Sequence, residues 1–387
     1  MGEISKNTLI SKSQKEFIET FNTSQIVTAV APGRVNIIGE HTDYNMGMSI
    51  PIGINRWICA IASKRDDDKI RVLSSNFKDE INTNRLNISK YKKSWKNHVA
   101  GCIKTFKDEH GLKKGFNLLI RGNIPIGFGM SSSAALEVSI LGCMMKLFTE
   151  NVNYRNILKM SVIVENDYLK VKSGYLDQYS SIYSIKSSPM LIDFSKLSHR
   201  YIESKIKNGI WLLINSMVKR ELTKSKYNER VNECILALEH INAAKDTKIA
   251  MNSVEDIDLT LLDNKTIKKR LRHILSENKR VKLMEKAISS GDLKLIGDIL
   301  VKSHKSLSKN YEVSCKELDS ILGISSIQNG FYGGRMMGGG FGGCFLCLIC
   351  KKSKEEFSAN VINSFEKEFN YQPEIEYIDF SDGLKFI

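Results

Sequence analysis

The order of apolar and polar positions divides the chain into a first half in which strands and helices alternate and a second half dominated by helices. Apolar runs bounded by turn-forming residues predict strands at 25–31, 56–63 and 116–122. The third run leads through a glycine-containing loop into a predicted helix, with apolar residues at helical spacing at Leu136, Ile140, Met144 and Leu147.

The second half of the pattern is mostly helical, with many charged positions over residues 228–308. Shorter elements surround this region: the sequence predicts an amphipathic helix at 354–369 and strands at 190–193, 210–215, 344–350 and 375–378. At roughly 150 residues per domain, 387 residues suggest two or three domains. We place a domain boundary near residue 200, which gives an N-terminal domain at 1–200 and a C-terminal domain at 201–387.

The composition is that of a folded globular protein, with 42% hydrophobic and 26% charged residues, and it excludes a disordered or fibrous protein. The formal net charge is +14, which could attract an anionic partner. The densest basic runs, 265–273 and 279–282, have helical spacing with apolar residues between the charges, which is typical of a solvated helix face. Because no recognition motif accompanies them, we expect no nucleic-acid partner.

No stretch of the chain approaches the roughly 18 apolar residues that a membrane span needs. The first residues are not followed by the apolar core of a signal peptide. We therefore expect no membrane partner and a cytoplasmic location.

Eight cysteines are scattered through apolar segments, as expected for buried thiols in a reducing compartment. Cys344, Cys347 and Cys350 have a spacing that resembles part of an iron–sulfur or zinc site. Their segment is short and wholly apolar, however, and therefore predicts a buried strand. On a strand, Cys347 points away from the other two, so we do not predict a metal site here.

The first motif that could carry chemistry is Pro-Gly-Arg-Val-Asn-Ile-Ile-Gly-Glu-His-Thr-Asp-Tyr-Asn at 32–45, whose polar residues we place after a strand. They are Arg34, Asn36, Glu40, His41, Asp43 and Asn45. The grouped Glu, His and Asp could bind a metal, or could accept hydrogen bonds from the hydroxyls of a sugar-like ligand. A capped turn with a satisfied histidine is equally compatible with the spacing.

Two glycine-containing motifs follow. Residues 125–137 place glycines and three serines where a strand gives way to a helix, and the free N–H groups of a helix N-terminus bind phosphate. This is no Walker A loop, because Phe128 stands where lysine is required. A flexible loop with serine caps is the alternative. At 338–343, five of six residues are glycine, which allows either close backbone approach or simply a tight turn before a strand.

Two carboxylates complete the candidate residues. Glu165 lies in a predicted helix, and Asp177 follows a glycine turn at 174. Taken alone, each would be interpreted as a surface carboxylate.

Together these motifs resemble the GHMP kinases, small-molecule kinases without a P-loop, and the motif at 32–45 resembles the version found in galactokinases. Further segments that resemble the galactokinase pattern are 215–222 with Tyr227 and Arg230, 303–319 and 381–383, so the likeness runs from about residue 28 to the end. The resemblance implies an α+β fold of two domains. An N-terminal mixed-sheet domain and a C-terminal α+β sandwich would enclose the active site in the cleft between them.

The resemblance also implies phosphoryl transfer from ATP to the anomeric hydroxyl of galactose. Asp177 would take or orient the proton of the sugar O1, with Arg34 beside it. Ser133 and Glu165 would bind Mg²⁺, which prefers hard oxygen ligands. The sugar would be held by Glu40, His41, Thr42, Asp43, Gly174 and Tyr227. ATP would contact Gly127, Gly129, Met130, Ser131, Ser132, Ser133, Ala134 and Ala135, with Ser74 and Trp95 on the adenine side.

Two alternatives to a galactokinase stay open. One is a sibling sugar 1-kinase, for example one that acts on N-acetylgalactosamine; the Thr-Asp-Tyr-Asn form of the first motif favours galactose. The other is a non-catalytic sensor of galactose and ATP; the full-length serine loop and the presence of Asp177 favour catalysis. In either case we expect small-molecule partners and a monomer.

Overall fold

The computed structural model describes residues 5–92, 94–125, 127–218 and 223–387. Residues 219–222 of the galactokinase-like segment 215–222 therefore lie outside the described residues. The strands are β1 (Val27–Ile38), β2 (Met48–Lys64), β3 (Lys69–Ser74), β4 (Asp79–Asn84), β5 (Phe116–Gly122), β6 (Met190–Asp193), β7 (Ser198–Tyr201), β8 (Gly209–Asn215), β9 (Phe331–Met336), β10 (Cys344–Cys350), β11 (Glu374–Ile378) and β12 (Lys385–Phe386).

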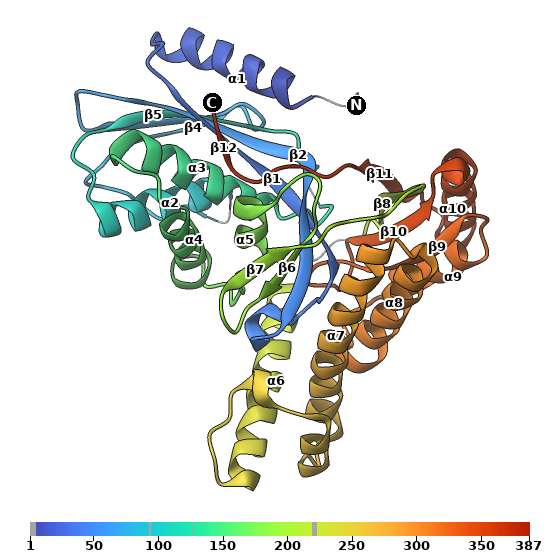
Figure 1. The fold of residues 1–387 in the computed structure, drawn as a ribbon. Coiled ribbons are helices and arrows are strands. Elements are labelled where there is room, and N and C mark those ends of the chain that lie inside the picture. The colour runs from blue at the N-terminus through green and yellow to red at the C-terminus, as the bar shows by residue number, and fades with distance from the viewer. Residues whose placement is uncertain (1–4, 93, 126, 219–222) are drawn as a thin grey trace.

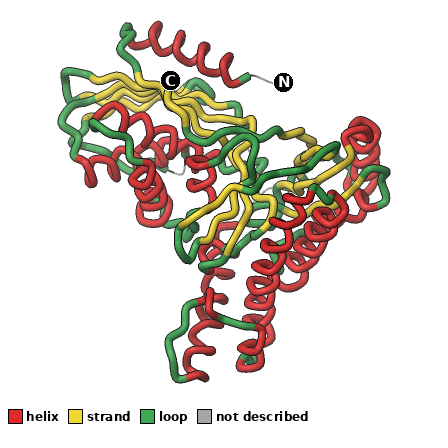
Figure 2. Tube along the Cα trace, viewed as in Figure 1, coloured by secondary structure: helices red, strands yellow, loops and turns green. Residues whose placement is uncertain are grey.

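Helices cover both sheets that these strands form (Figures 1 and 2). The α-helices are α1 (Lys6–Phe21), α2 (Trp95–His110), α3 (Ser132–Phe148), α4 (Tyr154–Ile163), α5 (Leu176–Tyr183), α6 (Thr223–Lys245), α7 (Lys265–Ser290), α8 (Leu293–Ser306), α9 (Lys316–Ser326) and α10 (Lys354–Phe369). Short 3₁₀ or π turns are η1 (Asp43–Asn45), η2 (Val164–Tyr168), η3 (Met251–Ser253), η4 (Asp256–Leu261), η5 (Leu307–Tyr311) and η6 (Lys351–Ser353).

The first sheet is mixed and has the strand order β12-β1-β2-β5-β3-β4, with β6 paired to β2 and β7 to β6. Strand β3 runs parallel to β5, and the other pairs are antiparallel. Helix α1 covers one face of this sheet, where Leu9 and Phe17 pack against Cys59 and Ile61. Helices α2 to α5 lie on the opposite face (Figure 1).

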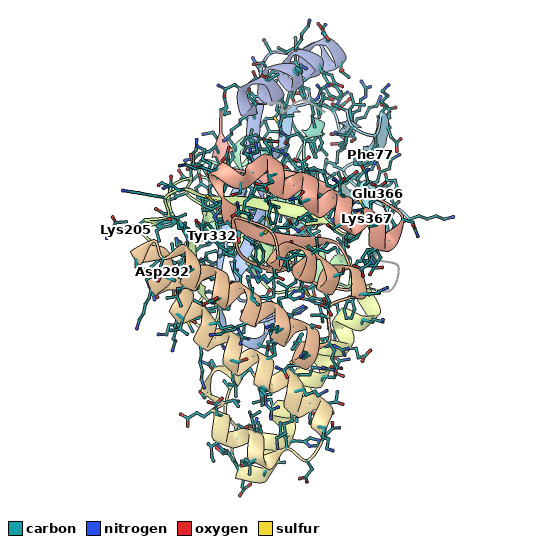
Figure 3. All side chains as sticks on the ribbon, turned by 90° about the vertical axis from the view of Figure 1, so that its right-hand side faces the viewer. Phe77, Lys205, Asp292, Tyr332, Glu366 and Lys367 are labelled. Atoms are coloured by element: carbon teal, nitrogen blue, oxygen red, sulfur yellow. The ribbon has the colours of Figure 1, made fainter. Side chains whose placement is uncertain are left out.

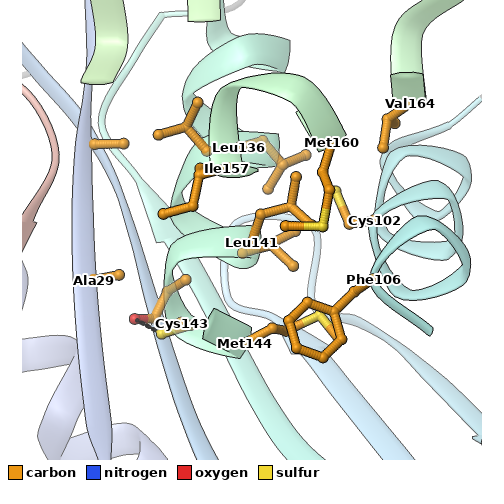
Figure 4. Close-up of a cluster of buried hydrophobic side chains, with 14 of the residues drawn as sticks. Ala29, Cys102, Phe106, Leu136, Leu141, Cys143, Met144, Ile157, Met160 and Val164 are labelled. Atoms are coloured by element: carbon orange, nitrogen blue, oxygen red, sulfur yellow. Dashed lines mark hydrogen bonds between the residues drawn. The ribbon is translucent and has the colours of Figure 1, made fainter. Parts of the chain in front are cut away.

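Helix α3 forms the centre of this layer because its side chains are apolar on nearly every face. From Ala134 to Met145 every residue is buried. Leu141 and Met144 pack with Phe106 of α2 and Met160 of α4 (Figure 4). A helix that is buried on all sides can hold its N-terminus in a fixed position, and that N-terminus carries the serines of the second motif.

The second sheet is antiparallel, in the order β11-β8-β10-β9. Alternate residues of its strands enter different cores. Leu213 and Leu346 pack with α7 and α8, whereas Leu212 and Cys347 face α9 and α10. Cys344 lies in the first of these cores and Cys347 in the second, as the strand pattern predicted. Among the described residues, no group of three or more His, Cys, Asp or Glu side chains is arranged to hold a metal ion.

Strands β1 and β2 are longer than predicted and connect the two sheets. Val35 and Ile37 of β1 lie in the same core as Trp211 of the second sheet. The prediction that the polar residues of the first motif follow a strand was wrong for Arg34 and Asn36, which lie within β1. The register against β2 shifts between residues 32 and 34 and again between 36 and 38. Such irregularities re-aim side chains without ending the strand.

The predicted boundary near residue 200 lies at the end of β7 of the first sheet, eight residues before β8 of the second begins at Gly209. The pairing of β12 with β1 returns residues 385–386 to the first sheet. Throughout the described part of the chain, each helix is too short or too polar to cross a lipid bilayer.

Candidate active site

Asp177 lies in the first turn of α5, and both of its carboxylate oxygens have partners. Arg34 of β1 donates from Nε to Oδ1 at 2.8 Å, and its Nη2 lies 2.6 Å from the same oxygen. The Ser131 hydroxyl donates to Oδ2 at 2.5 Å. Three segments that are far apart in sequence therefore meet at one carboxylate.

The serine loop is fixed against β1 by the same arginine. Arg34 Nη1 donates to the carbonyl of Gly129 at 2.8 Å, and the backbone N–H of Arg34 donates to the carbonyl of Met130 at 3.1 Å. Ser131 stands at the N-cap of α3 in a left-handed conformation with φ of 54°, and its side chain makes no capping bond. Left-handed non-glycine residues cost conformational energy and persist where the surroundings hold them. The Ser131 side chain therefore hydrogen-bonds to Asp177 and does not cap the helix.

Two cavities meet at this ion pair, and both include Arg34, Asp177, Gly338 and Gly339 in their walls. The first has a volume of about 230 Å³. Its other lining residues are Glu40, His41, Asp43, Glu165, Lys170, Val171, Ser173, Gly174, Leu176, Tyr227 and Asn228. The second has about 530 Å³. Its other lining residues are Pro125, Gly127, Gly129, Met130, Ser131, Ser132, Ser133, Asn215, Met217 and Val218. The predicted sugar residues and the predicted phosphate loop thus line adjoining spaces.

Glu40 is buried at the first cavity and held by three donors. Asn36 Nδ2 donates to Oε2 at 2.7 Å, while Arg335 Nη2 at 3.1 Å and the backbone N–H of Gly338 at 2.7 Å donate to Oε1. The glycine-rich motif therefore contacts the first motif directly. Gly338 has a φ of +75°, a conformation that glycine adopts without strain.

His41 also lines the first cavity, and only one of its ring nitrogens has a partner. Its Nδ1 lies 2.7 Å from the Tyr44 hydroxyl, whereas its Nε2 is buried without a partner among the described residues. Burial is the main reason that the pKa of His41 falls to about 3, so the imidazole is neutral near pH 7. An unpaired buried nitrogen in a cavity wall is suited to a hydrogen bond with a bound molecule.

Asp43 and Gly174 approach each other closely in the same wall. A Cβ atom at Gly174 would lie 2.1 Å from Oδ2 of Asp43, so only glycine fits without displacement. Burial, followed by the negative charge of Asp177, raises the pKa of Asp43 to about 7. The wall of the first cavity thus holds a carboxyl group that resists ionisation.

This raised pKa predicts that Asp43→Asn stabilises the ligand-free protein at high pH. Between about pH 4 and pH 7 the folded state retains a proton at Asp43 that the unfolded state has lost, so the free energy of unfolding falls as pH rises. We expect the variant to melt at a higher temperature than wild type at pH 8. The difference should shrink as pH falls through 7 and vanish near pH 4. Equal melting temperatures at pH 8 would contradict the prediction.

Glu165 and Ser133 form the predicted metal pair. The Ser133 hydroxyl lies 3.5 Å from Oε1 of Glu165, and the Ser173 hydroxyl donates to Oε2. Glu165 belongs to η2, a π turn that follows α4, and such turns are frequent at functional sites. Burial, followed by the charge of Glu137, raises the pKa of Glu165 to about 7. A cation beside this carboxylate would offset that cost, and the hard oxygens of the pair fit Mg²⁺.

Several predicted residues do not line either cavity. Thr42 is buried, and its hydroxyl lies 2.8 Å from each of the carbonyl oxygens of Gly39 and Met48, so it shapes the turn. Ala134 and Ala135 are buried in the first turn of α3. Ser74 and Trp95 lie at the end of β3 and the start of α2, and their proposed contact with adenine remains a prediction.

Some lining residues were not among those predicted. Gly338 and Gly339 belong to a motif that the sequence had marked, but a tight turn explained the glycines equally well. Lys170 and Asn228 carry no motif of their own, and only the folded chain brings them to the first cavity. Lys170 has a left-handed conformation with φ of 58°, which no feature of the sequence signals.

Three family models match parts of the chain. The galactokinase galactose-binding signature matches residues 15–64, the GHMP kinases N terminal domain matches 97–184, and the GHMP kinases C terminal family matches 284–369. The galactokinase of Staphylococcus carnosus is 34% identical over 392 residues, which cover 98% of this chain and all of that protein. The galactokinase of Thermosipho africanus is 36% identical over 354 residues, which cover 92% of this chain and 98% of that protein.

Solved structures extend the likeness to three dimensions. Galactokinase from Lactococcus lactis, crystallised with galactose, superposes with a TM-score of 0.92 at 32% identity, covering 98% of this chain and 100% of that one. Mevalonate kinase from Methanococcus jannaschii superposes with a TM-score of 0.64 at 20% identity, covering 93% of this chain and 99% of that one. This likeness shows a shared fold alone. The two-domain α+β fold is therefore confirmed as that of the GHMP kinases, and the chain belongs to the galactokinase family.

Proposed function

We propose that this protein phosphorylates the anomeric hydroxyl of galactose with ATP, giving galactose 1-phosphate and ADP. The observation that supports this most is the position of the Asp177–Arg34 ion pair in the shared wall of the two cavities. A sugar in the first cavity and a triphosphate in the second would both reach this pair. Holding both reactants in one geometry is a major part of phosphoryl-transfer catalysis.

In this proposal Asp177 accepts the proton of the sugar O1 as that oxygen bonds to the γ-phosphorus. The bond between the γ-phosphorus and the β–γ bridging oxygen breaks, and ADP leaves with that oxygen. Arg34 holds the carboxylate in place and lies close enough to stabilise negative charge on the transferred group. The first backbone N–H groups of α3, at Ser132 and Ser133, would bind phosphate oxygens as helix N-termini commonly do.

Glu165 and Ser133 would hold Mg²⁺, which commonly binds through one or two carboxylates together with substrate phosphates. The ion would neutralise charge on the phosphates of ATP. Replacing Glu165 by glutamine removes a charged ligand, so we expect a higher Mg²⁺ concentration at half-maximal rate. Asp167→Asn, in the same turn but exposed, is the control and should titrate as wild type. An unchanged Mg²⁺ titration of Glu165→Gln would remove this residue from the site.

One pair of aromatic residues supports the proposed contact with adenine. Trp95 at the start of α2 lies parallel to Phe77, with an interplanar angle of 3° and ring centroids 6.2 Å apart. Phe77 is 52% exposed and is labelled in Figure 3. Flat aromatic surfaces at the surface of a protein stack well against a nucleobase, which supports the proposed contact of Trp95 with adenine.

The direct test is ADP release by the purified protein with ATP and Mg²⁺ across a panel of sugars. The panel holds galactose, 2-deoxygalactose, N-acetylgalactosamine, glucose, mannose and galacturonate. We expect rapid turnover of galactose and none of glucose. Turnover of N-acetylgalactosamine alone would support the sibling kinase, and binding of galactose and ATP without turnover would support the sensor.

The monomeric state and the cytoplasmic location stay predictions. Sedimentation equilibrium of the purified chain would test the first, with a mass near 43.8 kDa as the expected result. A mass of twice this value would replace the monomer by a dimer.

A further inference from the structure

A row of hydrogen-bonded side chains leads from the helical part of the second domain to the sugar cavity. The Cys234 thiol of α6 lies 3.2 Å from the Tyr311 hydroxyl of η5. That hydroxyl lies 2.9 Å from the Tyr44 hydroxyl of η1, which in turn lies 2.7 Å from Nδ1 of His41. These four side chains, which we call the tyrosine relay, come from three separate segments of the chain, since His41 and Tyr44 lie in the same turn.

Three of the four relay side chains are shielded from water, and Tyr44 is partly buried. Cys234 and Tyr311 are fully buried, and His41 is 4% exposed. The Tyr311 ring packs against His41 and also against His273, with centroids 4.7 Å apart in each case. Burial raises the pKa of the Cys234 thiol to about 11 and lowers that of His41 to about 3. Each relay member is therefore uncharged near pH 7, and each of the three hydrogen bonds that join them holds one proton.

These protons can be ordered in only two ways along the row. Either every group donates toward His41, or every group donates away from it. A phenol is a better donor than a neutral imidazole N–H, and the bare imidazole nitrogen is the strongest acceptor among the four groups; the thiol is the weakest. The favourable order therefore runs from Cys234 to Tyr311, to Tyr44 and then to Nδ1 of His41.

We propose that the tyrosine relay fixes His41 with its proton on Nε2, so that His41 donates a hydrogen bond to an oxygen of the bound sugar. Tyr44 and Tyr311 are then positioning residues for sugar selectivity, since they act through His41. The Nε2 atom has no partner among the described residues, and because His41 lines the first cavity, a sugar bound there would supply one. The role toward the sugar rests on the proposed function, whereas the proton position does not.

The proton position is tested on the ligand-free enzyme by NMR with ¹⁵N-labelled histidine, using His41→Gln to assign the signals. We expect Nδ1 of His41 to have the shift of a bare ring nitrogen and Nε2 that of an N–H. In Tyr44→Phe both nitrogens should shift toward averaged values as the preference is lost. The opposite assignment in wild type overturns the proposal, whether or not the protein phosphorylates galactose.

The role in selectivity is tested with deoxy and deoxyfluoro galactoses at positions 2, 3, 4 and 6. Fluorine can accept a hydrogen bond but cannot donate one. At one position we expect the fluoro sugar to have a kcat/KM about threefold to tenfold above that of the deoxy sugar. This ratio corresponds to the contribution of one hydrogen bond. Tyr44→Phe should reduce this ratio toward one. The inductive effect of fluorine acts equally in both enzymes and cancels in the comparison.

Tyr201→Phe is the control, because its hydroxyl donates to the carbonyl of Tyr183 at the surface, away from the relay. It should keep the wild-type ratio at every position. If galactose is phosphorylated and Tyr44→Phe leaves every ratio unchanged, the selectivity role is wrong. If galactose is not phosphorylated at all, the proposed function fails and the NMR result alone decides the proton position.

Discussion

Replacing Asp177 by alanine is expected to lower kcat about 10²–10⁴-fold, the usual contribution of a positioned acid–base group, while galactose binding stays measurable. The carboxylate accepts hydrogen bonds from Arg34 and Ser131, and its loss removes the proton acceptor without emptying the first cavity of its other polar groups. Glu40 and His41 are held by their own partners. Turnover should therefore fall much further than affinity.

The measurement pairs steady-state kinetics with calorimetric titration of galactose. Asp177→Asn keeps the shape and one acceptor oxygen but cannot take a proton, so it should be almost as slow as the alanine variant. Asp66→Ala, which removes an exposed carboxylate paired with Lys114, serves as the control. Near-normal turnover of either Asp177 variant would remove this residue from the mechanism.

The second large effect is expected at Glu277, a fully buried carboxylate of α7 that holds the turn at residues 39–42 through the backbone N–H of Gly39. Its Oε1 accepts from the backbone N–H of Gly39 at 3.0 Å and from the Ser303 hydroxyl at 2.7 Å. Its Oε2 accepts from Arg280 Nε at 2.6 Å. Glu277→Ala leaves the Arg280 guanidinium without its carboxylate, which typically costs about 3–5 kcal/mol of stability.

Because Gly39 precedes Glu40, we also expect Glu277→Ala to raise the KM for galactose more than it lowers kcat. Glu277→Gln keeps an acceptor for Gly39 and should lose less stability. Glu285→Ala, on the same helix but paired with the exposed Arg200, is the control and should stay within about 1 kcal/mol of wild type. A melting curve of Glu277→Ala that matches this control would contradict the structural role.

The acid stability of the protein should depend on the same carboxylate. Although burial opposes ionisation, Arg280, His273 and Arg335 lower the pKa of Glu277 to about 2. A lowered pKa contributes stability above the unfolded value near 4.3, and this contribution is lost as pH falls toward 2. The stability advantage of wild type over Glu277→Gln should therefore shrink between about pH 4 and pH 2.

The elements that the sequence predicted best are short strands with mainly apolar runs between turn residues and one amphipathic helix. Strands β5, β6 and β10 and helix α10 have the predicted bounds. Strand β1 was predicted too short because Pro32, Arg34 and Asn36 interrupt its apolar pattern. In the fold these residues are buried, since the strand passes through the cleft between the two cores.

The site was predicted in its motifs but not in the contacts between them. Spacing alone could not say that Asp177 meets Arg34, because 143 residues separate them, and it left three interpretations of residues 32–45 open. Buried charges were the least predictable feature. Glu277 lies in a segment whose pattern suits a solvated helix, and Arg335 lies just before the glycine-rich motif. Only tertiary packing places their charges against residues 39 and 40.

Because β12 pairs with β1, the first sheet cannot be completed until residues 385–386 have left the ribosome. During synthesis the edge of β1 exposes backbone donors and acceptors of the kind that other extended chains can pair with. A chain that stops shortly before residue 385 would keep every motif of the site and yet leave Ala29 and Val30 of β1 without their partners in β12. Protection of this part of the β1 edge therefore depends on synthesis of the chain as far as residues 385–386.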